Sequence, residues 1–126
     1  MSSDHIRQRV LVVDDDEPIR TVVADVLSDE GYDVSLAVDG SEALSSCRES
    51  CPDLILLDLN MPGVDGREFL AAYRLDKGRH APVVIFSAVQ NAYRVATEVV
   101  ADGFLSKPFL IADLAATVRR HLAPVA

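Results

Sequence analysis

The sequence predicts an α/β protein, a three-layer sandwich in which a parallel sheet lies between two layers of helices. Short apolar segments alternate with amphipathic segments, five times over. Three of the short segments, 10–13, 54–57 and 83–86, are apolar throughout, as in parallel strands that are buried on both faces. With 126 residues the chain is long enough for one hydrophobic core, so we expect one domain.

Five strands are expected, at 10–13, 34–37, 54–57, 83–86 and 104–106. After the first strand, Asp16, Glu17 and Pro18 suit the first turn of a helix. Apolar residues then recur at intervals of three and four, which predicts a helix with one buried stripe. Gly31 is expected to end this helix.

Four further helices are predicted from the same kind of pattern. Ser41 is a good N-cap for the second helix, which is expected to stop before Pro52. Asp65 and Gly66 lead into the third helix, and the fourth is expected around 91–101. The last helix carries one apolar stripe, formed by Ile111, Leu114, Ala115, Val118 and Leu122.

Composition excludes several classes of function. The 20 acidic side chains outnumber the 12 lysines and arginines, and a net charge of −8 disfavours nonspecific binding to nucleic acid. No segment has the length of a signal peptide core or a membrane span, so we expect a cytoplasmic protein without membrane contact. Cys47 and Cys51 are spaced to share a helix face, and we expect two ordinary reduced thiols.

The residues that follow the strands carry the chemistry. The carboxyl ends of parallel strands meet at one edge of the sheet, where ligands bind. The polar residues expected at this edge are Asp14, Asp15, Asp16, Asp58, Ser87 and Lys107. Clustered carboxylates repel one another, and a hard divalent cation such as Mg²⁺ removes that cost. Asp58 is then the best candidate nucleophile for phosphoryl transfer, with Ser87 and Lys107 contacting the phosphoryl oxygens, while Asp16 and Glu17 could be helix caps only.

Four segments resemble the receiver domain of two-component response regulators, of the kind found in chemotaxis regulators. They are Val12–Arg20 with its acidic residues, Leu54–Gly66 with Asp58 and Met-Pro-Gly, Val84–Ala88 with Ser-Ala, and Phe104–Phe109 with Lys-Pro. The resemblance runs from about Val10 to Leu122. It implies a single receiver domain over 1–126 with its core at about 10–122, and a flavodoxin-like sheet of order 2-1-3-4-5 with five helices.

The resemblance also implies a metal site. Asp15 and Asp58 would be direct ligands of Mg²⁺ or Mn²⁺, Asp14 would hold the ion through water, and the backbone carbonyl of Asn60 would complete the set of protein ligands. Asp58 would be the phosphoacceptor.

The remaining site residues are assigned by the same resemblance. Lys107 would bind the phosphoryl group, Ser87 would be the switch hydroxyl, and the amide of Ala88 would contact a phosphoryl oxygen. Phe104 would be the aromatic residue that turns inward, and the Lys107–Pro108 peptide bond is expected to be cis. Ser87 stands where the family more often has Thr, and Phe104 where it often has Tyr.

The implied function is signalling without turnover of an external substrate. A histidine kinase or phosphotransfer protein would phosphorylate Asp58, and the change in conformation would control a partner or an output domain. The partner face would include Val99, Val100, Phe104 and Asp113, from the fourth helix, the fifth strand and the fifth helix. No direct contact with nucleic acid is expected. Homodimer formation on phosphorylation stays open, as does the choice between a stand-alone receiver and part of a longer regulator.

Two other functions are alternatives. A haloacid-dehalogenase-type phosphatase would use the Asp-x-Asp within Asp14–Asp16, but that family has Thr or Val where Pro18 stands, and it leaves the segment after Asp58 unexplained. A flavodoxin-like mononucleotide binder needs hydroxyls and amides after the first strand, where three carboxylates would repel a flavin phosphate.

Overall fold

The structure, a computed structural model, describes residues 7–59, 66–76, 80–88 and 101–122. Within these ranges the strands and helices follow one another in the predicted order. The elements are β1 (Arg9–Val13), α1 (Glu17–Asp29), β2 (Asp33–Ala37), α2 (Gly40–Glu49), β3 (Leu54–Leu57), α3 (Gly66–Leu75), β4 (Val83–Ala88), β5 (Gly103–Lys107) and α5 (Ile111–His121). The helix predicted around 91–101 lies outside the described residues.

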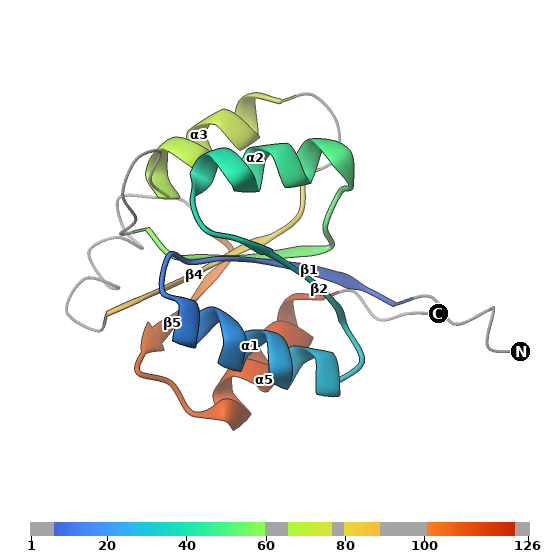
Figure 1. Ribbon diagram of the computed structural model, residues 1–126, viewed down its shortest axis with the longest axis vertical. Coiled ribbons are helices and arrows are strands. Elements are labelled where there is room, and N and C mark those ends of the chain that lie inside the picture. The colour runs from blue at the N-terminus through green and yellow to red at the C-terminus, as the bar shows by residue number, and fades with distance from the viewer. Residues whose placement is uncertain (1–6, 60–65, 77–79, 89–100, 123–126) are drawn as a thin grey trace, which may run out of the picture.

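The five strands form one parallel sheet in the order β2-β1-β3-β4-β5, which confirms the predicted topology. Helices α2 and α3 cover one face of the sheet, and α1 and α5 cover the other (Figure 1). The register aligns Val13 of β1 with Leu57 of β3, and Leu57 with Ile85 of β4. The residues that follow β1 and β3 therefore leave the sheet side by side.

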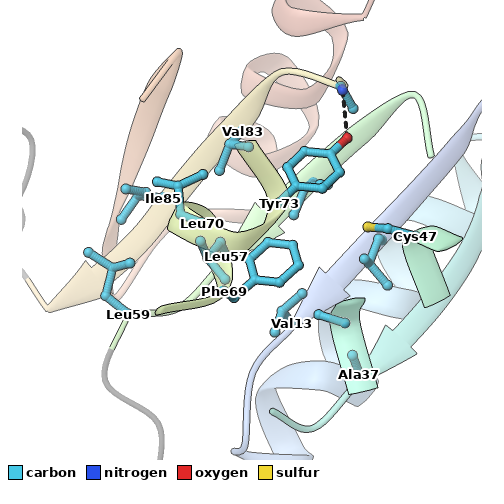
Figure 2. Close-up of a cluster of buried hydrophobic side chains, with 14 residues drawn as sticks. Val13, Ala37, Cys47, Leu57, Leu59, Phe69, Leu70, Tyr73, Val83 and Ile85 are labelled. Carbon is cyan, nitrogen blue, oxygen red and sulfur yellow. Dashed lines mark hydrogen bonds between the residues drawn. The ribbon is translucent and has the colours of Figure 1, made fainter. Parts of the chain in front are cut away.

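Two clusters of buried side chains hold the layers together. Leu11, Val13, Ile55 and Leu57 belong to the cluster under α2 and α3, whereas Val10, Val12, Leu54 and Leu56 belong to the cluster with residues of α1 and α5. Figure 2 shows the first cluster, in which Phe69, Leu70 and Tyr73 of α3 pack over the sheet. Because alternate residues of β1 and β3 enter opposite clusters, residues 10–13 and 54–57 are all apolar, as the sequence predicts.

The start of α2 differs from the prediction. Asp39, and not Ser41, is the N-cap: its carboxylate accepts a hydrogen bond from the backbone N–H of Glu42 (2.8 Å). Glu42 in turn accepts one from the N–H of Val38 (3.0 Å). Two carboxylates thus satisfy amides on both sides of the helix start, as in a capping box, which the single hydroxyl of Ser41 would not do.

Two other expectations need correction. Ile111 is 59% exposed because it is the first residue of α5, and the buried stripe of that helix begins only at Leu114. Cys47 and Cys51 do not share a helix face, because α2 ends at Glu49; Cys47 is buried and Cys51 is exposed. Burial raises the pKa of the Cys47 thiol to about 11, consistent with an unreactive thiol.

Among the described helices, none is long and apolar enough to cross a membrane.

Candidate functional site

The carboxyl ends of β1 and β3 bring two buried acids together. The N–H of Asp58 donates to the carbonyl of Val13 (2.9 Å), so the chain continues the parallel ladder for one residue after β3. The N–H of Asp14 donates to the carbonyl of Ala37 in the same way (3.1 Å). Asp14 is completely buried and Asp58 is 5% exposed. The backbone ladder therefore fixes both acids at the predicted edge of the sheet.

Asp15 completes a cluster of three carboxylates with these two acids. One oxygen from each of Asp14, Asp15 and Asp58 lies within 4.8 Å of the others, and Asp15 is exposed. Carboxylate oxygens are the ligands that Mg²⁺ prefers, and an open side lets the ion keep water or phosphate oxygens as further ligands. The three side chains therefore suit the predicted cation.

Lys107 lies against the two buried acids. Its Nζ donates to Oδ2 of Asp14 (2.8 Å) and to Oδ2 of Asp58 (3.3 Å), and its side chain is 19% exposed. Burial by itself would lower the pKa of Lys107, but the hydrogen bond to Asp14 and the charge of Asp58 outweigh it, and the pKa is raised. Lys107 is thus a charged ammonium next to the proposed phosphoacceptor. The Lys107–Pro108 peptide bond is cis, as expected.

Arg20 is a site residue that the sequence analysis did not assign. Its Nη1 donates to the backbone carbonyl of Asp14 (2.7 Å) from the first turn of α1. The carboxylate of Asp14 also accepts a hydrogen bond from the N–H of Asp16 (2.9 Å). Asp16 is itself the N-cap of α1, which confirms its capping role. One indication of this role is present in the sequence, which is the position of Arg20 at the end of the acidic segment Val12–Arg20.

Gly66 allows α3 to begin directly on the backbone of the proposed phosphoacceptor. A Cβ atom at this position would lie 2.5 Å from the carbonyl oxygen of Asp58 and 2.6 Å from Cα of Leu59. Real Cβ contacts are essentially never that short. Glycine is therefore required here for close approach.

The other predicted site residues are described in part. Ser87 and Ala88 are the last residues of β4, in register with Ser106 and Lys107, so their backbone lies at the same edge of the sheet. Their side chains, like Asn60, Val99 and Val100, lie outside what the structure describes. The predicted switch and amide contacts therefore stay predictions.

The predicted partner face is also described in part. Phe104 is 38% exposed and, together with Asp113, lines a cavity of about 440 Å³ between β5 and α5. Phe104 and Asp113, the two residues of the predicted partner face that the structure describes, therefore line the same cavity.

Comparisons with known proteins agree with this geometry. The model of the response regulator receiver domain family matches residues 10–119. The chain is 41% identical to the DNA-binding response regulator MtrA of Mycolicibacterium smegmatis over 121 residues, which are 94% of this chain and 52% of MtrA. It thus spans about half the length of that relative.

Solved structures show the same fold. The chemotaxis response regulator CheY4 of Vibrio cholerae superposes with a TM-score of 0.83 at 35% identity, covering 93% of this chain and all of that one. The receiver domain of the sensor histidine kinase PA1611 of Pseudomonas aeruginosa, in which a magnesium ion is coordinated in the active site cleft, gives 0.83 at 29% identity, over 92% and 98% of the two chains. By sequence motif, sheet order and family match, this chain belongs to the response regulator receiver domains of two-component systems.

Proposed function

We propose that this receiver domain accepts a phosphoryl group on Asp58 and that Mg²⁺ or Mn²⁺, held by Asp14, Asp15 and Asp58, is required. The observation that carries the proposal is the convergence of three carboxylates within 4.8 Å, with the Lys107 ammonium on two of them. The backbone carbonyl of Asn60 is proposed as a further ligand. When bound, the divalent cation supplies charge neutralisation at the attacking and transferred oxygens.

The charges in the cluster explain why a cation and a phosphoryl group would be accepted together. Three carboxylates exceed the single ammonium by two negative charges, so a divalent cation restores neutrality. Lys107 already lies within hydrogen-bond distance of Asp58, and it can turn from the carboxylate to a phosphoryl oxygen with little movement. The hydrogen-bond partner of Lys107 would then depend on whether Asp58 is phosphorylated.

In the proposed step, a carboxylate oxygen of Asp58 attacks the phosphorus of a phosphohistidine. The O–P bond forms and the P–N bond breaks, and the electron pair stays on the imidazole of the donor. The donor is a histidine kinase or a phosphotransfer protein. The chain turns over no external substrate, so hydrolysis of its own aspartyl phosphate is its only further reaction.

Phosphorylation would change the conformation because the phosphoryl group contacts Ser87, Ala88 and Lys107 in one state better than in the other. Phe104 would follow Ser87 inward and alter the face that it forms with Asp113. A downstream partner is proposed to bind this face.

MtrA is a DNA-binding regulator, but the region of similarity covers only part of it, and nucleic-acid binding is not proposed for this chain. The cytoplasmic location and the single-domain span of 1–126 stay predictions, and homodimer formation on phosphorylation stays open.

Intact mass after incubation with acetyl phosphate and Mg²⁺ tests the proposal. The wild type should gain one phosphoryl group, EDTA should prevent the gain, and Asp58→Asn should abolish it. Asp16→Asn is the matched control, since it removes a neighbouring carboxylate while asparagine still caps α1. A gain that persists in Asp58→Asn would place the acceptor elsewhere and would revive the phosphatase alternative.

A further inference from the structure

The ammonium of Lys107 has a third neighbour besides the two acids. Nζ lies 4.7 Å from the centroid of the Phe86 ring, over its face. Phe86 is completely buried in β4, directly before Ser87. The face of an aromatic ring carries partial negative charge and attracts a cation, more strongly where water is excluded.

The ring of Phe86 is held in place by a second aromatic residue. Phe109 packs against it with centroids 6.3 Å apart and planes tilted by 59°. The separation of the centroids is within the range of aromatic pairs that the charge distribution of the rings stabilises. The face of Phe86 therefore stays presented to Lys107, and the contact spans β4, β5 and the connection to α5.

Three contacts thus define the position of the ammonium. Asp14 and Asp58 attract it by charge and hydrogen bonding, and Phe86 supports it from the core. A lysine stem has four rotatable bonds, so each further contact reduces the number of conformations in which the ammonium can turn toward solvent. An aliphatic residue at position 86 would fill most of the core volume without attracting the charge.

We propose that Phe86 is a positioning residue for Lys107, whose ring face holds the ammonium beside Asp58 for phosphoryl transfer. This inference rests on the proposed function, and it adds a residue to the site that works through Lys107. Without the ring, the ammonium is expected to sample more conformations, and phosphorylation of Asp58 should slow.

The test uses Phe86→Leu together with 3,4,5-trifluorophenylalanine at position 86, which keeps the ring shape but weakens the negative charge on its face. Phe69→Leu is the matched control, because Phe69 is equally buried but belongs to α3 and lies in the cluster on the opposite face of the sheet. Two readouts are needed: the rate of phosphorylation by acetyl phosphate, and the NMR shifts of the ε-methylene protons of Lys107. The chain has only two lysines, so Lys77→Arg assigns the signal.

We expect the ε-methylene protons of Lys107 to be shifted upfield by the ring in the wild type and in Phe69→Leu, and not in Phe86→Leu. The rate should fall about threefold to thirtyfold in Phe86→Leu, and by an intermediate factor with the trifluorinated ring. Equal rates for Phe86→Leu and Phe69→Leu, or an unshifted signal in the wild type, would overturn the role of Phe86 and leave the proposed function of Asp58 standing. A wild type that takes up no phosphoryl group would instead overturn the proposed function.

Discussion

The two edges of the sheet use aspartate in different ways. At the amino edge, Asp53 accepts a hydrogen bond from the N–H of Arg9 (2.8 Å) and Asp102 accepts one from the N–H of Val83 (2.8 Å). Asp53 thus pairs the first amide of β1, and Asp102 pairs the first amide of β4. At the carboxyl edge, Asp14 and Asp58 are buried next to each other and share one ammonium.

The difference separates acids that stabilise the fold from the acids that are proposed to carry the function. A carboxylate that accepts a hydrogen bond from the backbone N–H at the start of a strand pairs an amide that the ladder leaves over, and so stabilises the fold. Clustered buried carboxylates raise the energy of the folded state unless cations offset their charges. The carboxyl edge is therefore the region whose stability should depend on Lys107 and on added divalent cations.

Removing Lys107 should have the largest effect on stability. Lys107→Ala leaves the buried carboxylates of Asp14 and Asp58 without their ammonium, and we expect a loss of about 3 kcal/mol in the free energy of unfolding. Asp102→Asn at the amino edge should cost about 1 kcal/mol or less, because asparagine still accepts a hydrogen bond. Urea unfolding with and without Mg²⁺ checks both: the cation should stabilise both variants, because both keep the three carboxylates, and it should stabilise Lys107→Ala more. Equal losses at the two edges would contradict the comparison.

Gly66→Ala should be the next largest change. The added Cβ would collide with the backbone of Asp58 and Leu59, and relief requires a shift of α3 or of the site. We expect a loss of about 2 kcal/mol and slower phosphorylation in the same variant, measured by urea unfolding and by intact mass against time. A variant with unchanged rate and stability would show that the close approach is unimportant.

Asp15→Asn should separate stability from cation binding. Neutralising the exposed member of the cluster relieves repulsion, so the metal-free variant should be more stable by about 1 kcal/mol. The loss of one charged ligand should weaken Mg²⁺ binding by about 10-fold or more, as measured by calorimetric titration. If Asp15→Asn raised both the metal-free stability and the affinity for Mg²⁺, or lowered both, Asp15 would not belong to a cation site with Asp14 and Asp58.

The smallest effect is the pH dependence from Lys107. Its pKa is raised in the folded state, so its contribution to stability is full below the pKa of an unfolded lysine, about 10.4, and is lost as the pH rises through the higher folded value. The difference in unfolding free energy between wild type and Lys107→Ala should therefore shrink above pH 10.4. A difference that stays constant from pH 7 to pH 11 would mean that the ammonium is not paired with the acids.

The sequence was sufficient for the strands and for the convergence of the acids. Uniformly apolar segments indicate strands buried on both faces. In a parallel sheet the carboxyl end of each strand has a defined place, which located Asp14 and Asp58 directly after β1 and β3 and Lys107 at the last position of β5. Chain spacing could not reveal Arg20, whose long side chain reaches back to Asp14. It could not reveal the contact of Phe86 with Lys107 either, because any core residue of β4 is apolar.

Local signals were also misjudged where two residues compete. Ser41 and Asp39 are both good N-caps, and only the reciprocal contact of Glu42 with Val38 decides for Asp39. Ile111 matches the spacing of the apolar stripe, but its place at the first position of α5 leaves it exposed. Periodicity gives the face of a residue and not its distance from the core.

Locating the phosphoryl group in the chain tests the central claim most directly. After phosphorylation by acetyl phosphate with Mg²⁺, borohydride reduction and digestion should mark a single peptide, the one that contains Asp58, and EDTA should abolish the mark. A mark on any other residue, or one that forms equally without a divalent cation, would contradict the proposed site.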